Sequence, residues 1–317
     1  MINLDRLLRQ SCDAVVMVRP RRFYVNPETI SSNSFQSKES FVKEEELADL
    51  AIAEFNCCVD ILASEGVRVF DFDGNSSSPD ELYPNNWFST HEDGRIFVYP
   101  MFSENRRLER RFDIFSGLSY AGFEIRSVTD LSYLEKENTY LESTGSMIFD
   151  RIYKKIYACN SVRTSKKLLD EFAESLGYEV VFFDAVDDEG KEIFHTNMFM
   201  SLGCGFAVFC SESVLDKAER ELVLKSLEDS EREIVDLSLQ QVYNFAGNVL
   251  QVRNQNGESL FIISDRGYKA LREDQIAVIS KYARIVPLPI NFIETCGGGG
   301  VRCMMAEVKL PRAHRGL

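Results

Sequence analysis

Residues 293–308 of the 317-residue chain read IETCGGGGVRCMMAEV, and this stretch decides how the rest of the sequence is interpreted. Its four consecutive glycines, 297–300, allow positive φ angles and a close approach of the backbone to a ligand. Cys303 follows at the head of an alternating apolar run that predicts a buried strand over 303–310. A thiol at that junction is either a nucleophile or an inert core residue, since free cysteine is commonly buried. The rest of the chain has to decide between the two interpretations.

The strand predicted at 303–310 is the last element of a repeated pattern of hairpin, helix and strand. The predicted hairpins span 87–99, 146–159, 196–210 and 248–263. The predicted helices span 43–65, 103–121, 164–176, 213–229 and 266–282, and the strands after them span 67–72, 123–128, 179–184, 233–237 and 284–288. A polar loop from about residue 20 to 41 precedes the first helix, and a loop of this length is usually functional or disordered.

The residues at the start of the hairpins are almost evenly spaced. They are separated by 56, 53, 53 and 55 positions and are Asn86, Glu142, His195, Asn248 and Cys303. A fixed period in this range predicts a radial or stacked repeat. The run 303–310 has no second arm after it, so its natural partner is a strand predicted at 14–19, and that pairing would close a ring without open edges.

The predicted fold class is therefore a five-module, pseudo-symmetric α/β propeller whose ring is closed by the terminal strands. We expect one domain over residues 1–317, with residues 1–13 and 311–317 peripheral or flexible.

Equivalent positions of a ring converge on its axis, so the repeat alone brings Cys303, His195 and Glu142 toward one another. A thiol, an imidazole and a carboxylate suit nucleophilic attack on an electrophilic carbon, with the imidazole transferring protons. His195 is one of only three histidines, the others being His91 and His314. Taken alone, His195 would be a hydrogen-bonded core residue and Glu142 a turn residue. The repeat favours the functional interpretation of both.

Composition restricts the classes of partner. The chain is 44% hydrophobic and 27% charged, with a formal net charge of −14 that argues against nucleic acid as the main partner. No apolar run reaches the ~18 residues of a membrane span and the N-terminus has no signal-like apolar core, so we expect no membrane partner and a cytoplasmic location. The eight cysteines show no metal-ligand spacing and the glycine run lacks the Lys-Ser/Thr of a phosphate loop. We therefore expect no metal and no cofactor.

Motifs along nearly the whole chain resemble those of the guanidine-modifying enzymes of the pentein superfamily, which include arginine deiminases, dimethylarginine hydrolases and amidinotransferases. The resemblance is closest to amidinotransferase-like bacterial hydrolases of the citrulline ureidase type. Each motif is short, and their specificity lies in their joint occurrence. The matching segments are 17–20, 33–36, 79–80, 83–88, 99–111, 141–147, 163–164, 195–197, 245–248 and the glycine run with Cys303.

The resemblance implies that Cys303 is the nucleophile, His195 the general acid and base, and Glu142 the carboxylate that grips the guanidino or ureido group. It implies that Arg163 and Arg106 hold the α-carboxylate of the substrate, where bidentate geometry favours arginine. An alternative for Arg106 is that the charged run 104–111 is the solvated start of a helix. The full set of substrate-binding positions is Asp80, Asn86, Arg106, Arg163 and Asn197.

Two amides replace acids of the family pattern. Many deiminases carry carboxylates at the positions of Asn86 and Asn197. A cationic guanidinium favours carboxylates, whereas an amide offers a neutral ureido group both a donor and an acceptor. We therefore expect hydrolysis of citrulline to ornithine, ammonia and carbon dioxide.

Arginine deimination, dimethylarginine hydrolysis, a transferase outcome and a catalytically silent binding protein remain as alternatives. The expected partner is a small amino acid, and the sequence leaves a homo-oligomer open.

Overall fold

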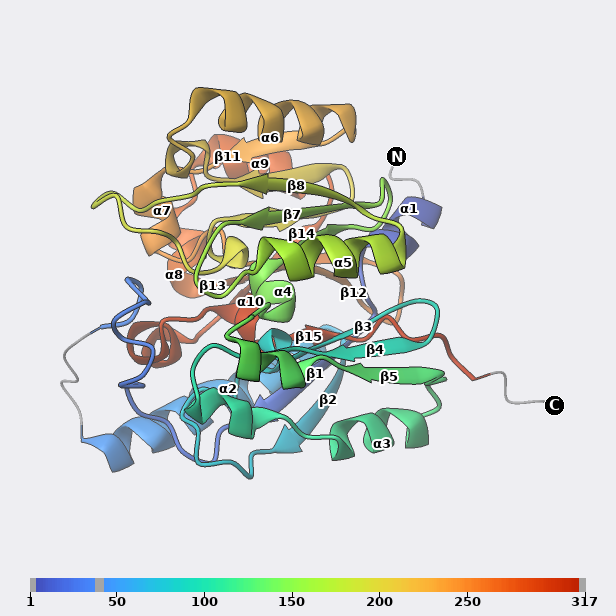
Figure 1. The fold of residues 1–317 in the computed structure, drawn as a ribbon, viewed down its shortest axis with the longest axis vertical. Coiled ribbons are helices and arrows are strands. Elements are labelled where there is room, and N and C mark those ends of the chain that lie inside the picture. The colour runs from blue at the N-terminus through green and yellow to red at the C-terminus, as the bar shows by residue number, and fades with distance from the viewer. Residues whose placement is uncertain (1–3, 38–42, 314–317) are drawn as a thin grey trace.

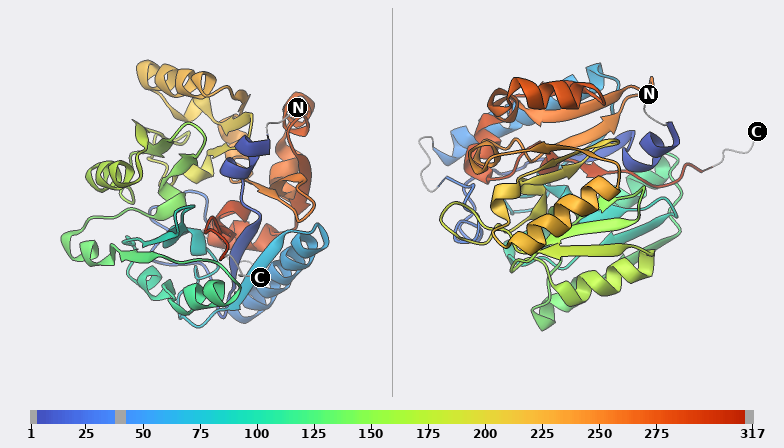
Figure 2. Two further views of the ribbon diagram at one scale, coloured as in Figure 1. Left: turned by 90° about the vertical axis from the view of Figure 1, so that its right-hand side faces the viewer. Right: turned by 90° about the horizontal axis from the view of Figure 1, so that it is seen from above.

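The computed structural model describes residues 4–37 and 43–313, which form an α/β fold of five three-stranded sheets (Figure 1). In every sheet the middle strand pairs antiparallel with one neighbour and parallel with the other. A parallel pair needs a crossover connection, and in each module this connection contains a helix. The crossover helices lie on the outside of the molecule and the sheets lie within (Figure 2).

The first module combines β1 (Ala14–Arg19), α2 (Glu44–Ser64), β2 (Arg68–Asp73) and the late strand β15 (Ala306–Glu307). The second contains β3 (Phe88–Thr90), β4 (Arg95–Val98), α3 (Asp113–Tyr120) and β5 (Ser127–Asp130). The third contains β6 (Ile148–Asp150), β7 (Lys155–Cys159), α5 (Lys166–Leu176) and β8 (Glu179–Phe183). The fourth contains β9 (Met200–Leu202), β10 (Phe206–Phe209), α6 (Lys217–Asp229) and β11 (Glu233–Asp236). The fifth contains β12 (Leu250–Arg253), β13 (Ser259–Ser264), α8 (Asp265–Ala270), α9 (Glu273–Ser280) and β14 (Arg284–Leu288).

The predicted pairing between the two ends of the chain is confirmed. β15 runs antiparallel to β1, with Val16 opposite Ala306. β1 is buried over Ala14–Val18, as its apolar sequence predicts, and it lies between β15 and β2.

The strand predicted over 303–310 is wrong at its start. Residues Val301–Met304 form a single helical turn, α10, and β15 is confined to Ala306–Glu307. The Cys303 N–H donates to the carbonyl of Gly300 (3.1 Å), and the Arg302 N–H donates to Oδ1 of Asn248 (3.0 Å). Contact with the fifth module therefore overrides the local alternation of apolar residues, and it places Cys303 on a helical turn.

Two predicted helices are each interrupted. The span 103–121 divides into a 3-10 turn (Asn105–Glu109) and α3, because Arg110 is extended. The span 266–282 divides into α8 and α9 at Leu271, and the Arg272 N–H donates to Oε1 of Gln275 (2.9 Å), which caps α9. The strand predicted at 123–128 is displaced to β5, because Phe123 instead forms an isolated bridge with Arg312.

The N-terminal residues are more integrated than expected. Helix α1 (Leu4–Gln10) leads into Ser11 and Cys12, which are buried. The ammonium group of Lys309 donates to the carbonyls of Leu8 (3.2 Å) and Ser11 (3.1 Å), satisfying groups that a helix end leaves free. His314 lies outside the described residues. Among the residues that are described, no helix has the length and apolar character needed to cross a bilayer.

Candidate active site

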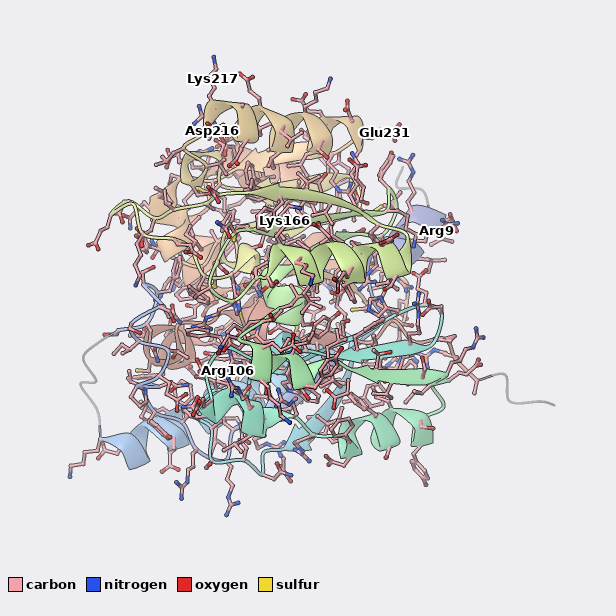
Figure 3. All side chains as sticks on the ribbon, in the orientation of Figure 1. Arg9, Arg106, Lys166, Asp216, Lys217 and Glu231 are labelled. Atoms are coloured by element: carbon pink, nitrogen blue, oxygen red, sulfur yellow. The ribbon has the colours of Figure 1, made fainter. Side chains whose placement is uncertain are left out.

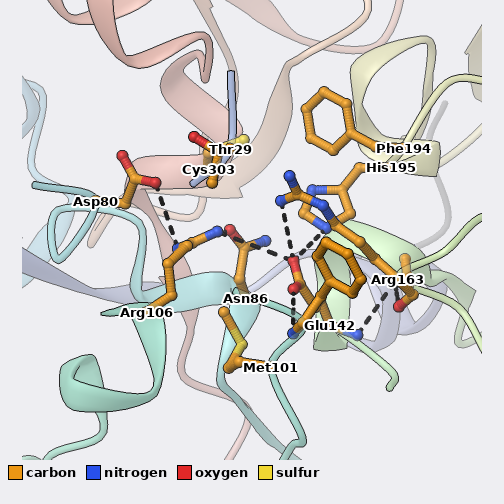
Figure 4. Close-up of polar contacts among 12 residues, drawn as sticks. Thr29, Asp80, Asn86, Met101, Arg106, Glu142, Arg163, Phe194, His195 and Cys303 are labelled. Carbon is orange, nitrogen blue, oxygen red and sulfur yellow. Dashed lines mark hydrogen bonds and ion pairs between the residues drawn. The ribbon is translucent and has the colours of Figure 1, made fainter. Parts of the chain in front are cut away.

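The five evenly spaced positions all lie within six residues before the strand that follows them, and all five side chains are buried. Asn86 ends a 3-10 turn (Pro84–Asn86), whereas Glu142 and His195 immediately precede α4 (Ser143–Ser146) and another 3-10 turn (Thr196–Met198). Asn248 lies just before β12, and Cys303 lies in α10. Asn86, His195 and Cys303 line one pocket, and the carboxylate of Glu142 contacts His195 (Figure 4).

The thiol of Cys303 lies against two amide side chains. Nδ2 of Asn248 is 3.3 Å from the sulfur and Nδ2 of Asn197 is 3.6 Å from it. Burial raises the pKa of Cys303, and the hydrogen bond from Asn248 only partly opposes that effect. The resting thiol is therefore protonated near neutral pH, and its nearest polar neighbours are amides.

His195 is held by Glu142. Nε2 of His195 is 2.7 Å from Oε2 of Glu142. Burial lowers the pKa of His195 to about 4, although the bond to Glu142 acts in the opposite direction. The imidazole is therefore neutral at pH 7, and because a carboxylate only accepts, its proton lies on Nε2. This tautomer leaves Nδ1 as a proton acceptor.

Glu142 is an ionised carboxylate inside the protein. Burial by itself would raise its pKa, but Arg163 and His195 outweigh burial and lower the pKa below the usual range. Oε1 accepts from the Phe102 N–H (3.0 Å), and Oε2 lies 3.4 Å from Nη1 of Arg163. These contacts fix the carboxylate and, through it, the histidine ring.

Arg106 lies at the opposite wall of the pocket and is buried, so the solvated interpretation of this residue is wrong. Its Nε and Nη2 form a two-pronged pair with Glu109 (2.9 and 3.0 Å). Nη2 also donates to Oδ1 of Asn86 (3.1 Å), and Nε is 3.6 Å from Asp80. Burial raises the pKa of Glu109 to about 7, with Arg106 opposing it.

The contact with Arg106 fixes the orientation of the Asn86 amide. A guanidinium only donates, so the amide oxygen must face Arg106 and Nδ2 must point away from it. Nδ2 of Asn86 is buried and has no hydrogen-bond partner in the described structure. The pocket therefore contains one buried hydrogen-bond donor, Nδ2 of Asn86, without an acceptor among the described residues.

One nitrogen of the Arg163 guanidinium has no hydrogen-bond partner among the described residues. Its Nη2 donates to the hydroxyl of Ser32 (2.8 Å), and its buried Nε has no partner among the described residues. The guanidinium lies over the ring of Phe194, 4.6 Å from the centroid. Burial lowers the pKa of Arg163.

Two glycines allow the walls of the pocket to approach closely. A Cβ on Gly145 would lie 2.4 Å from Nδ2 of Asn86, and one on Gly297 would lie 2.1 Å from the hydroxyl of Tyr83. Neither distance is possible for a real side chain, so only glycine fits at these positions.

Sequence reasoning missed three contributors to the site. Glu109 was hidden in the charged run 104–111, although its spacing of three residues from Arg106 was a usable signal. Asn248 was recognised as a repeat position without a role. The long polar loop supplies Thr29 to the pocket lining beside Asn33, and no motif marked Thr29.

The remaining predicted residues lie as follows. Asp80 lines the pocket, accepts from Nδ2 of Asn26 (2.7 Å) and has an unpartnered Oδ1. His91 is outside the pocket lining and contacts the hydroxyl of Ser89 (2.8 Å). In the part of the chain that the structure describes, no group of three or more His, Cys, Asp or Glu residues is arranged to hold a metal ion.

Comparison with known structures finds the same fold. The N-terminal domain of ArgZ, an arginine dihydrolase from the ornithine–ammonia cycle in cyanobacteria, is 15% identical with a TM-score of 0.72 and covers 94% of this chain and 98% of that domain. Unliganded AgrE is 15% identical with a TM-score of 0.74, and the match covers 95% of this chain but 40% of AgrE. An adduct of a dimethylarginine dimethylaminohydrolase with S-methyl-L-thiocitrulline is 14% identical with a TM-score of 0.62, covering 93% and 99%. At these identities the likeness concerns the fold.

No curated protein matches the chain. The family model described as "N,N dimethylarginine dimethylhydrolase, eukaryotic" matches residues 19–310, which include every residue of the pocket described above. The chain therefore belongs to the dimethylarginine dimethylhydrolase family, within the pentein superfamily.

Proposed function

We propose that this protein is a cysteine hydrolase that cleaves a C–N bond in the guanidino or ureido group of an arginine-like amino acid, and that citrulline is its preferred substrate. Membership of the family supports hydrolysis of a guanidino-type C–N bond. The lining of the pocket supports the assignment of Cys303 and His195 to that reaction. The neutral head group is supported by one observation in particular, the unpartnered Nδ2 of Asn86.

The free donor on Asn86 distinguishes the two kinds of head group. A ureido group carries a carbonyl oxygen that accepts this hydrogen bond, whereas a guanidinium carries only donors. Rotating the Asn86 amide would turn its oxygen toward a guanidinium head group. The bond between that oxygen and Arg106 would then be lost. Burying a donor that stays unsatisfied costs about 1–3 kcal/mol.

The polar contacts support proposed roles for further residues. The Nε and Nη2 of Arg163 are positioned to take the α-carboxylate in place of the Ser32 hydroxyl. The corresponding edge of Arg106 is occupied by Glu109, so Arg106 orients Asn86 instead of gripping the substrate. The free Oδ1 of Asp80 suits the α-ammonium group, and Asn197 positions the thiol.

In the proposed reaction Nδ1 of His195 accepts the proton of Cys303, and the sulfur attacks the ureido carbon. The bond from that carbon to the side-chain nitrogen breaks, and the departing amine of ornithine takes the proton from His195. A carbamoyl group remains on Cys303. His195 then removes a proton from water, the hydroxide attacks the carbamoyl carbon, and the S–C bond breaks to restore the thiol. The released carbamate decomposes to ammonia and carbon dioxide.

We also propose that the five modules form the closed ring that the sequence predicts. The pairing of β15 with β1 and the approach of one hairpin-start residue from each of five modules both support a closed propeller around the site.

Arginine or dimethylarginine is the second candidate substrate. The ionised Glu142 favours it, because a buried negative charge would attract a cationic head group.

The decisive experiment incubates the protein separately with citrulline, arginine, dimethylarginine and agmatine and measures ornithine, citrulline and ammonium. Ornithine formed from citrulline is the expected result. Citrulline formed from arginine or dimethylarginine would support the second candidate, and saturable binding without product would indicate a silent binding protein.

A further inference from the structure

A second cavity lies at the far ends of the strands that lead away from the active site. Its volume is about 380 Å³, within the range of small-molecule sites, and it is lined by turns from several modules. Its lining includes Arg6, Arg232, Lys281, Tyr153, Tyr282 and Cys204. Glu231 at this cavity and Arg106 in the active site are well separated in Figure 3.

Arg232 carries the strongest evidence for a ligand. Its side chain is 1% exposed, and Nη1 forms a close ion pair with Asp150. Nε donates to the carbonyl of Gly203 (3.3 Å), but the buried Nη2 has no hydrogen-bond partner in the described structure. Asp150 is already saturated, since its other oxygen accepts from the N–H groups of Ile152 (3.1 Å) and Tyr153 (2.9 Å). A buried guanidinium nitrogen without a partner is costly, and an anion would satisfy it.

The charge and shape of the lining define the class of ligand. The lining contains three cations, Arg6, Arg232 and Lys281, and one carboxylate, Glu231, which forms an ion pair with Arg6. Asp150 and Glu233 pair with two of these cations from outside the lining. The walls include the rings of Tyr153 and Tyr282, and the latter ring is stacked on Phe206 at 5.6 Å. Rigid aromatic walls beside a charged donor suit a carboxylate attached to a flat apolar body.

The cavity is connected to the catalytic residues through two short strands. β9 (Met200–Leu202) begins two residues after the 3-10 turn that follows His195, and the residue after β9, Gly203, has the carbonyl that accepts from Arg232. β6 follows Glu142 and α4 and ends at Asp150, the ion-pair partner of Arg232. A ligand on Arg232 would therefore contact the ends of the two modules that carry His195 and Glu142.

We propose that this cavity is a second binding site for a small organic carboxylate with an aromatic or similarly flat apolar body, bound through Nη2 of Arg232 and placed beside Tyr153 and Tyr282. This site is separate from the catalytic pocket and does not depend on the substrate proposed above.

The test is titration calorimetry of the full chain with benzoate, with acetate and benzamide as controls. Benzoate is expected to bind with a Kd on the order of 1 mM or tighter. Acetate lacks the ring and benzamide lacks the charge, so each should bind at least tenfold more weakly. Benzoate should also slow alkylation of Cys204, which mass spectrometry of the digested protein measures.

Three variants locate the binding. Arg232→Lys keeps a cation beside Asp150 but loses the free Nη2, so it should weaken benzoate binding at least tenfold. Lys281→Gln removes an exposed charge at the rim and should weaken binding severalfold. Lys225→Gln, on the exposed face of α6 outside the cavity, is the matched control and should bind as the wild type does.

Arg163→Lys should likewise leave benzoate binding unchanged, because it alters only the catalytic pocket. If Arg232→Lys fails to fold, Lys281→Gln and the protection of Cys204 decide the question. Absence of saturable benzoate binding, equal binding of benzamide, or loss of binding in Arg163→Lys instead of the cavity variants would overturn the proposal.

Discussion

Replacing Asn86 by Asp tests how the site distinguishes a neutral head group from a cationic one. The change hardly alters side-chain volume, but it removes Nδ2, the buried donor without a partner. The new carboxylate keeps its contact with Arg106, because an oxygen still faces Nη2 at the position now 3.1 Å away. The variant should therefore fold, and its effect should be confined to the pocket.

The expected magnitude follows from the one lost hydrogen bond. With citrulline, the ureido oxygen loses its donor and meets a negative charge, which costs about 1–3 kcal/mol. That free energy corresponds to roughly a five- to 150-fold fall in kcat/KM. With arginine, the same carboxylate meets a cation, so binding improves even if turnover stays slow.

The assay is the ratio of kcat/KM for citrulline to that for arginine, measured in the wild type and in Asn86→Asp. We expect the ratio to fall by at least tenfold. Asn86→Leu is the matched control, because it removes the donor at similar size without adding charge, so it should impair citrulline without favouring arginine. A ratio that rises or stays constant in Asn86→Asp would refute the assignment of Asn86 to the head group.

Three further predictions concern the nucleophile and its surroundings. Cys303→Ala should abolish turnover, whereas Cys296→Ala should keep most of it, and equal effects would remove Cys303 from its assigned role. Arg163→Lys should reduce kcat/KM for citrulline by at least tenfold with little change in Tm, since the charge stays but the two-pronged contact is lost; unchanged kinetics would exclude Arg163 from substrate binding. Because burial raises the pKa of Cys303, its thiolate fraction should increase with pH, and inactivation by iodoacetamide without substrate should accelerate steadily from pH 7 to 9. In Asn248→Asp the rise should move to higher pH, because a carboxylate beside the sulfur disfavours the thiolate; a rate that is constant above pH 7 would contradict the protonated resting thiol.

The sequence predicted the modules well, because hairpin, helix and strand each leave a local periodic signal. The spacing of Asn86, Glu142, His195, Asn248 and Cys303 also indicated that these residues would lie together, since equivalent positions of a repeat meet regardless of local detail. Strands such as β1 and β14 lie at their predicted bounds, because their apolar sequences give a clear local signal.

What the sequence did not predict depends on contacts between distant residues. The run after Cys303 alternates like a strand, but the bond from the Arg302 N–H to Asn248 selects a helical turn. Glu109 is 0% exposed in its side chain, while Glu104 in the same charged run is 84% exposed. Composition and periodicity are alike for these two glutamates, and only the position of Arg106 in the folded chain separates them.

The pairing of β15 with β1 has a consequence for biosynthesis. Val15 emerges from the ribosome early, yet its partner Glu307 follows about 290 residues later, which is roughly 15 to 60 seconds at ordinary translation rates. During that interval one edge of an apolar strand has no native partner, and such an edge is a template for aggregation. Cys303, the proposed nucleophile, also emerges only shortly before β15. If Cys303 is the nucleophile as proposed, a nascent chain stays inert until the segment that pairs with β1 is being made. Chaperones that bind extended apolar segments should engage β1 for most of the synthesis of the chain.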